Sequence, residues 1–91
     1  MEIKWTAKAQ SDLIRVHDFL ALVNKPVAIR TVQTLSAAPL QLLQHPRIGE
    51  RLEEFEPRDV RRIVVGAYEM RYEIVGSTVF ILRIWHGRED R

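Results

Sequence analysis

Residues 60–85, which read VRRIVVGAYEMRYEIVGSTVFILRIW, decide the fold. Three runs rich in β-branched and aromatic residues are separated by two glycine-containing dipeptides, Gly66-Ala67 and Gly76-Ser77. The runs are Val60–Val65, Tyr68–Val75 and Thr78–Trp85. Such residues favour strands, and a glycine-led dipeptide between two strands is typical of a tight hairpin. The stretch therefore predicts a three-stranded antiparallel meander.

The middle run alternates strictly between two kinds of side chain. One face would carry Tyr68, Met70, Tyr72 and Ile74, and the other Glu69, Arg71 and Glu73. Because successive side chains of a strand point to opposite faces, this alternation predicts one buried and one solvated face. The segment Val79–Ile84 is interrupted only by Arg83, which is typical of a central strand with both faces largely covered.

Upstream of the meander, a short strand and an amphipathic helix are expected. Glu2–Trp5 alternates polar and apolar residues, and Thr6 is a candidate N-cap. Apolar residues then recur at spacings of three and four, at Ala9, Leu13, Val16, Leu20 and Val23. The charged residues Lys8, Asp12, Arg15 and Asp18 lie off this stripe. This periodicity predicts a helix with one apolar face.

A second helix should follow at once. Asn24-Lys25 is a natural stop for the first helix, and Pro26 suits the first position of the next, where its missing N–H costs nothing. A second apolar stripe comprises Ala28, Val32, Leu35 and Leu42, widened by Ile29 and Leu43. Two helices joined by so short a turn should form an antiparallel hairpin.

Pro39 interrupts the second helix. A proline inside a helix removes one hydrogen bond and clashes with the preceding turn, so we expect a kink or a restarted turn there and an end near His45-Pro46. The segment Arg47–Arg58 has no clean period and reads as a loop with room for a short extended piece. The order of elements is thus β-α-α-β-β-β. We expect an α+β fold in which residues 1–91 form one small domain, with the helical hairpin on one face of an antiparallel sheet.

Composition excludes several classes of function. The chain has no cysteine, which removes thiolate catalysis and Cys-ligated zinc. His17, His45 and His86 fall in three different elements without ligand-like spacing, so no metal site is expected, and scattered glycines give no phosphate loop and no cofactor site. No apolar run approaches the roughly 20 residues that span a bilayer, and the start does not resemble a signal peptide. We expect a cytoplasmic protein that does not contact membranes.

The charge distribution argues against a general nucleic-acid binder. Residues 47–91 contain nine arginines and nine acidic residues, so the net charge of +2 comes from the first half. A protein driven by phosphate neutralisation would show an unbalanced basic face. Arginines with acidic neighbours favour ordered side chains or protein contacts.

The order of these elements and three short motifs resemble the RelE/ParE superfamily of type II toxin–antitoxin toxins. The motifs are HPRIGE (45–50), VRRIVVGAYEMRYEI (60–74) and VFILRIWHGRED (79–90). The likeness covers nearly the whole chain. It implies one of two activities, since RelE-like members cleave mRNA at the ribosome as metal-independent endoribonucleases, whereas ParE-like members inhibit DNA gyrase and are not hydrolytic enzymes.

A RelE-like nuclease would need a base, cations for the phosphorane and an acid for the leaving oxygen. The resemblance implies Glu50 as a possible base, Arg61, Arg71 and Arg83 as the cations and His86 as the acid. Imidazole titrates near neutrality and suits that role. Two positions depart from the nuclease pattern: Glu69 stands where an arginine is common, and Gly87 where a tyrosine often follows the histidine.

These departures favour the ParE-like branch, with DNA gyrase as the target and no catalytic residues. Arginine and tryptophan most often dominate protein interfaces, so a target-binding surface is expected on the loop and the C-terminal tail. Its candidate residues are Arg47, Arg51, Trp85, His86, Arg88 and Arg91. Trp85, at the end of an apolar run, also suits plain packing.

A toxin of this kind implies a cognate ParD- or RelB-like antitoxin, encoded alongside, that neutralises it in a hetero-oligomer. The sequence does not assign the residues that contact the antitoxin. Two alternatives stay open beside the gyrase inhibitor: the ribosome-dependent nuclease, with ribosome and mRNA as partners, and a non-toxic antitoxin-binding module.

Overall fold

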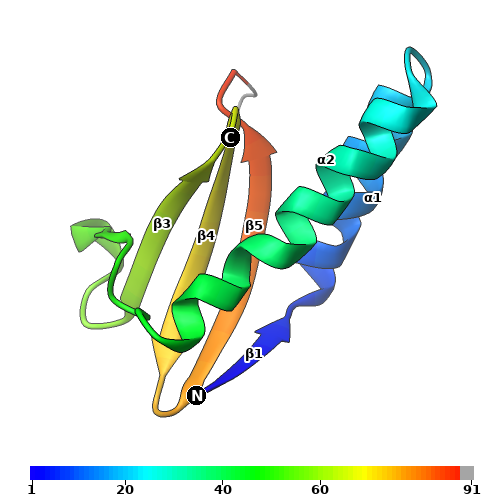
Figure 1. The fold of residues 1–91 in the computed structure, drawn as a ribbon. Helices are drawn as coiled ribbons and strands as arrows, with labels where there is room; N and C mark the ends of the chain where they lie inside the picture. The colour runs from blue at the N-terminus through cyan, green and yellow to red at the C-terminus, as the bar shows by residue number, and fades with distance from the viewer. Residues whose placement is uncertain (89–91) are drawn as a thin grey trace.

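A computed structural model describes residues 1–88 and consists of a helical hairpin beside a five-stranded sheet (Figure 1). The helices and strands are β1 (Glu2–Trp5), α1 (Ala7–Ala21), α2 (Lys25–Ala37), β2 (Glu50–Arg51), β3 (Asp59–Val65), β4 (Tyr68–Val75) and β5 (Thr78–His86). Two short 3₁₀ segments are η1 (Ala38–Leu43) and η2 (Glu53–Phe55). The strand order is β1-β5-β4-β3-β2. Within residues 1–88 no helix is both long and apolar enough to cross a membrane.

The predicted meander is confirmed, and the sheet differs from the expected one in a single respect. Strands β3, β4 and β5 pair antiparallel, and Gly66 and Gly76 lead their two hairpin turns at φ angles of 60° and 59°. A positive φ at the first turn residue matches the twist of the flanking strands. The first strand, however, pairs parallel with β5, so the sheet is mixed rather than purely antiparallel. β2 is the short extended piece within the predicted loop.

Pro39 acts as expected. The regular helix α2 ends at Ala37, and the chain continues as the 3₁₀ segment η1, in which Pro39 and Leu42 are buried. The restarted turn thus accommodates the missing N–H and carries the apolar stripe onward into the core.

The core lies between the helical hairpin and one face of the sheet. Its buried cluster contains Ala9, Val16, Leu35, Leu42, Met70, Tyr72, Val79, Ile81 and Ile84. Both predicted stripes therefore supply core residues, but their outer members do not. Val23 is 85% exposed because α1 ends at Ala21, and Ile29 is 52% exposed.

Two acidic residues contradict the sequence interpretation because both are buried. Asp12 was expected off the apolar stripe, yet it is only 4% exposed. Glu69 was assigned to a solvated sheet face and is 5% exposed. Each carboxylate lies against arginine side chains, which the apolar periodicity of a single segment does not reveal.

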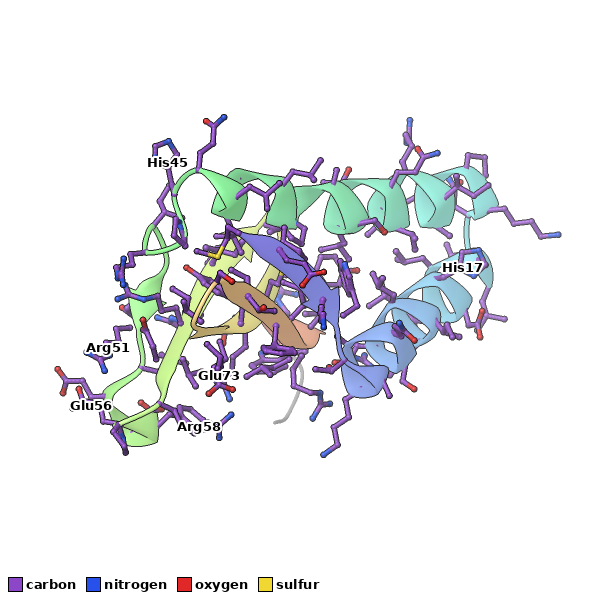
Figure 2. All side chains as sticks on the ribbon, turned by 90° about the horizontal axis from the view of Figure 1, so that it is seen from below. His17, His45, Arg51, Glu56, Arg58 and Glu73 are labelled. Atoms are coloured by element: carbon purple, nitrogen blue, oxygen red, sulfur yellow. The ribbon has the colours of Figure 1, made fainter. Side chains whose placement is uncertain are left out.

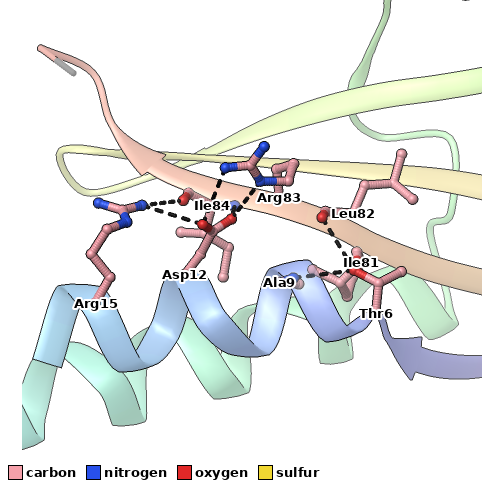
Figure 3. Close-up of polar contacts among 8 residues, drawn as sticks. All are labelled: Thr6, Ala9, Asp12, Arg15, Ile81, Leu82, Arg83 and Ile84. Atoms are coloured by element: carbon pink, nitrogen blue, oxygen red, sulfur yellow. Dashed lines mark hydrogen bonds and ion pairs between the residues drawn. The ribbon is translucent and has the colours of Figure 1, made fainter. Parts of the chain in front are cut away.

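Asp12 fastens α1 to the exposed edge of β5 (Figure 3). Strand β1 covers that edge only as far as Ile81, so the N–H and C=O of Ile84 have no strand beside them. The Ile84 N–H donates to Asp12 Oδ2 at 2.8 Å, and Arg15 Nη2 donates to the Ile84 carbonyl oxygen at 3.0 Å. Arg83 Nε donates to Asp12 Oδ2 at 2.9 Å. Two side chains of a helix therefore supply the partners that a neighbouring strand would provide.

Thr6 extends the same arrangement at the start of α1. Its backbone N–H and its hydroxyl both donate to the Ile81 carbonyl oxygen, at 3.1 and 2.8 Å. The hydroxyl oxygen also accepts from the Ala9 N–H at 3.1 Å, which confirms the predicted N-cap. The first helix is thus tied to β5 by hydrogen bonds over its first three turns.

Replacing Asp12 by asparagine should destabilise the fold by about 2–3 kcal/mol, because Arg83 and Arg15 would lose a buried anionic partner. Urea unfolding measures the change in the free energy of unfolding. The matched control is Asp18→Asn on the exposed side of the same helix, which should cost less than about 0.5 kcal/mol. Equal effects of the two substitutions would contradict the structural role of Asp12.

The carboxylate of Asp12 also makes the free energy of unfolding depend on pH in the acidic range. Burial alone would raise the pKa of Asp12, but the hydrogen bonds from Arg83 and the Ile84 N–H and the charges of Arg83 and Arg15 hold that pKa below the ordinary 3.8. A carboxyl whose pKa is lowered by folding stabilises the native state above its unfolded pKa, and this contribution is lost as the pH falls through the folded value. The stability difference between wild type and Asp12→Asn should therefore be full above pH 3.8 and shrink below it, as urea titrations at several pH values would show.

Candidate functional site

The sheet face turned away from the helices carries Arg71, one of the cations that the sequence suggested for function. Arg71 lies between two aromatic rings, with its guanidinium carbon 5.1 Å from the ring centre of Phe55 and 4.7 Å from that of Trp85. Its Nη2 is 3.6 Å from Oε2 of the buried Glu69. Trp85 is only 5% exposed and packs against this guanidinium. The guanidinium of Arg71 is thus stacked between two aromatic rings, and its charge is neutralised by Glu69.

The neighbouring arginines of this face are also paired with carboxylates. Arg62 donates to Glu50 Oε1 at 2.7 Å and to Glu69 Oε1 at 3.2 Å. Arg58 forms a two-point contact with Glu73 at 3.0 and 2.8 Å, and this hydrogen bonding lowers the pKa of Glu73 despite its partial burial. Figure 2 shows Arg58 and Glu73 reaching toward each other near the η2 end of the sheet. A substrate phosphate would therefore have to compete with bound carboxylates.

His86 lies on the opposite face of the sheet, toward α1. It pairs across the strands with Tyr68, whose ring meets the imidazole edge-on at a centroid distance of 5.3 Å. The imidazole Nδ1 accepts from the Arg88 N–H at 3.1 Å. Together with Arg15, Val16 and Phe19 these residues line a hollow of about 460 Å³.

The structure does not bring the nuclease candidates together. Glu50 and Arg71 belong to the face away from the helices, whereas His86 faces α1. Arg61 shares the helix side but pairs with Tyr72, about 13 Å along β4 from the His86 partner Tyr68 at the usual rise of a strand.

The two remaining cationic candidates have structural partners of their own. Arg61 donates to Asp59 at 2.9 Å and to the Gly49 carbonyl oxygen at 3.0 Å. Arg83 extends around the edge of β5 to Asp12. Neither guanidinium is directed at the imidazole of His86 by these contacts.

The expected target-binding residues fall into two groups at opposite ends of the sheet. Arg47 and Arg51 lie by the loop that precedes β3, where Arg51 pairs across the strands with Arg61. His86 and Arg88 lie at the other end, beside the β3–β4 turn. Arg91 lies outside the described residues. These assignments stay predictions. Trp85 is buried and packs against Arg71, so it can hold that guanidinium in place.

The three histidines are dispersed as the sequence suggested. Figure 2 shows His17 and His45 at opposite ends of the molecule. Among residues 1–88, no group of three or more histidine, aspartate or glutamate side chains is arranged to hold a metal ion.

Sequence reasoning missed three residues that shape these surfaces. Arg15 and Phe19 line the hollow next to His86, and Phe55 covers Arg71. The sequence could have indicated Phe19. A phenylalanine outside the apolar stripe of a helix does not face the core, so it is expected to form an exposed apolar surface. The contact of Phe55 with a strand residue far along the chain had no local signal.

Tyr72 holds the loop that carries Arg47. Its buried hydroxyl donates to the Pro46 carbonyl oxygen at 2.7 Å and accepts from the Gly49 N–H at 3.0 Å. Burial raises the pKa of Tyr72, so the hydroxyl stays protonated at neutral pH. A side chain at Gly49 would place its Cβ 2.6 Å from both the Tyr72 hydroxyl and the Arg62 carbonyl oxygen. Only glycine therefore fits beneath this hydroxyl.

Tyr72→Phe should lower the free energy of unfolding by about 1–3 kcal/mol, because the Gly49 N–H would lose its buried acceptor. Hydrogen exchange offers a local measurement, since the Gly49 amide should exchange much faster in the variant. Gly49→Ala perturbs the same contact from the other side and should also destabilise the loop. Unchanged protection of the Gly49 amide in Tyr72→Phe would contradict this role.

Comparisons with known proteins agree with this architecture. Residues 3–91 match the family model described as ParE toxin of type II toxin-antitoxin system, parDE. Among solved structures, one titled Chromosomal ParDE TA system from P. aeruginosa superposes with a TM-score of 0.78 at 27% identity, covering 94% of this chain and 95% of the other. The small α+β fold is thus that of a toxin from a type II toxin–antitoxin system.

Two curated relatives from Caulobacter vibrioides carry the other name of the superfamily. Toxin RelE2 is 31% identical over 94% of both chains, and Toxin RelE1 is 30% identical over 94% of this chain and 92% of its own. The chain belongs to the ParE toxin family of type II toxin–antitoxin systems, within the RelE/ParE superfamily. Membership implies an antitoxin partner, and both names of the superfamily, ParE and RelE, occur among the matching proteins.

Proposed function

We propose that this toxin inhibits DNA gyrase and does not cleave RNA, and that its cognate antitoxin neutralises it. The observation that carries this proposal is the division of the nuclease candidates between the two faces of the sheet. His86 faces α1, while Glu50 and Arg71 lie on the far face. General acid–base catalysis requires the acid and the base within reach of one substrate, directly or through one water.

Charge on the far face of the sheet supports the same proposal. A phosphorane needs cations aimed at it before the reaction begins. Here Arg62 and Arg71 are both committed to Glu69, and Arg71 is also held between Phe55 and Trp85. A buried carboxylate at the centre of this cluster would repel an approaching phosphate.

Protein contact suits the exposed arginines better. Arg47 and Arg88 are exposed at opposite ends of the sheet, where they are accessible to a large partner. Arginine contributes disproportionately to protein interfaces because it combines a planar charge with several donors.

One observation favours the second candidate, a RelE-like ribonuclease. The two curated relatives are both named RelE toxins. Their name is a property of those proteins, and in this chain Glu69 and Gly87 still depart from the nuclease pattern. A non-toxic antitoxin-binding module is the third candidate.

Induced expression of the lone chain in bacteria should cause a DNA-damage response and filamentous growth with intact transcripts. The purified chain should inhibit gyrase supercoiling, and Arg47→Glu together with Arg88→Glu should raise the concentration needed by about tenfold or more, since two interface cations are reversed. Supercoiling assays and transcript mapping provide the measurements.

His86→Ala separates the two activities. In a gyrase inhibitor His86 is one of several contacts, so inhibition should weaken by less than about tenfold. A nuclease that loses its general acid should lose about 10²–10⁴-fold in rate. Early arrest of protein synthesis with cleaved transcripts would overturn the gyrase proposal. Normal growth on induction of the folded chain would instead favour the non-toxic module.

A further inference from the structure

The loop of residues 45–49, between η1 and β2, is held in place by side chains of the sheet. The Tyr72 hydroxyl binds its backbone at two points. Arg61 Nη1 donates to the carbonyl oxygens of Arg47 and Gly49, at 3.1 and 3.0 Å. Two side chains from neighbouring strands thus make four hydrogen bonds to the backbone of one short loop. We call this segment the η1–β2 loop.

Further contacts close the η1–β2 loop internally and at both ends. The Ile48 N–H donates to the His45 carbonyl oxygen, and the His45 N–H donates to the Gln41 carbonyl oxygen, both at 3.1 Å. Strand β2 follows directly, with Glu50 opposite Arg62. A loop that is already constrained loses little conformational freedom when it binds, so it is pre-organised for a partner.

These contacts use the backbone, not the side chains, of Arg47 and Ile48. Arg47 contributes its carbonyl oxygen and Ile48 its N–H. Both side chains are exposed, and that of Ile48 belongs to a residue that is 58% exposed. Together with His45 and Pro46 they line a hollow of about 370 Å³. The η1–β2 loop therefore presents an apolar side chain and a cation beside a depression.

Single exposed apolar side chains are common on protein surfaces and by themselves indicate nothing. Ile48 differs in how its backbone is fixed. The Tyr72 residue beneath the loop is fully buried, and Gly49 leaves no room for a Cβ against the Tyr72 hydroxyl. A buried hydroxyl, an arginine and a glycine together determine where two exposed side chains lie. Fixed apolar and arginine side chains in one place are typical of the residues that dominate protein interfaces.

We propose that Ile48 is the apolar anchor of the target contact and enters an apolar pocket on the surface of gyrase, with Arg47 against a carboxylate at the rim of that pocket. This inference rests on the proposed function for the identity of the target. A protein pocket suits Ile48 better than DNA does, because a phosphate backbone offers little apolar contact and its binding relies on several cations at once. A carboxylate partner suits the planar guanidinium of Arg47.

Inhibition of gyrase supercoiling by the full chain tests this contact. Ile48→Asn should raise the concentration needed for half inhibition by about 30-fold or more, because a polar amide would have to enter an apolar pocket. Ile48→Val keeps most of the apolar contact and should lose only about two- to fivefold. The matched control is Ile14→Asn on α1, where the isoleucine is 62% exposed, and it should inhibit as the wild type does. Circular dichroism checks that each variant is folded.

A second measurement separates a protein pocket from a phosphate contact. Calorimetry measures binding of each chain to the gyrase holoenzyme without DNA, and fluorescence anisotropy measures binding to a DNA duplex alone. Ile48→Asn should weaken binding to the holoenzyme, and the wild-type chain should not bind the duplex. Binding to the duplex that Arg47→Glu abolishes and Ile48→Asn leaves unchanged would overturn the proposal in favour of a phosphate contact.

The support of the loop gives a third variant. Tyr72→Phe keeps the side chains of Arg47 and Ile48 but removes the hydroxyl that binds the loop. Inhibition by the folded variant should weaken by about three- to tenfold, because the loop must then be ordered on binding. Ile48→Asn should have a smaller effect in the Tyr72→Phe background than in the wild type, because both changes act on one contact.

Failure of this inference differs from failure of the proposed function. A wild-type chain that neither binds nor inhibits gyrase would overturn both. If the wild type inhibits gyrase and folded Ile48→Asn inhibits it equally well, only the assignment of the anchor is wrong. A loss in Ile14→Asn as large as that in Ile48→Asn would contradict the assignment in the same way.

Discussion

The carboxylate of Asp12 is the contact on which the arrangement of helices and sheet depends. It accepts the Ile84 N–H at the edge of β5 and binds Arg83, while Arg15, one turn further along α1, donates to the Ile84 carbonyl oxygen. An unpaired strand edge is a site for unwanted pairing with other chains. Here the helix closes part of that edge with side chains, which fixes both the position of α1 and the end of the sheet. A buried charge is tolerated because it is surrounded by donors.

Two groups of arginines within residues 1–88 differ in the charges that surround them. Those of the far sheet face and its rim form a network with carboxylates, in which Glu69 joins Arg62 to Arg71. That network neutralises its own charge and leaves little field for a phosphate. Arg15 and Arg88 instead line the hollow beside His86, and Arg30 lines a second hollow between α2 and the β3–β4 turn; none of the described residues lining either hollow is acidic. The net charge of +2 is therefore distributed unevenly: the far face of the sheet is close to neutral, whereas the surface with Arg15, Arg30 and Arg88 is basic.

Local patterns were enough to predict the elements but not their lateral contacts. Strand alternation and glycine-led turns predicted the meander, and the N-cap at Thr6 and the break at Pro39 followed from backbone chemistry. The parallel pairing of β1 with β5 joins residues about seventy-five positions apart, and no local signal specifies it. The burial of Asp12 and Glu69 was missed for the same reason, since their partners come from other elements.

At the candidate site, the types of residue were predictable from the sequence. The face of the sheet on which His86 lies was not, because it depends on a register shift between Arg71 and Tyr72 that the sequence does not reveal.

The hollow beside His86 follows from where the helical hairpin contacts the sheet. Hydrogen bonds to β5 come from the N-cap Thr6 and from Asp12 and Arg15 of α1, and Val16 is the last buried residue of that helix. Beyond it α1 and α2 pack on each other and leave the sheet, so Phe19 and Leu22 have no strand to cover them. A chain of this length has too few residues to enclose every apolar surface that its helices present. The same shortage leaves the far end of the hairpin, with Phe19 and Leu22, as an exposed apolar surface.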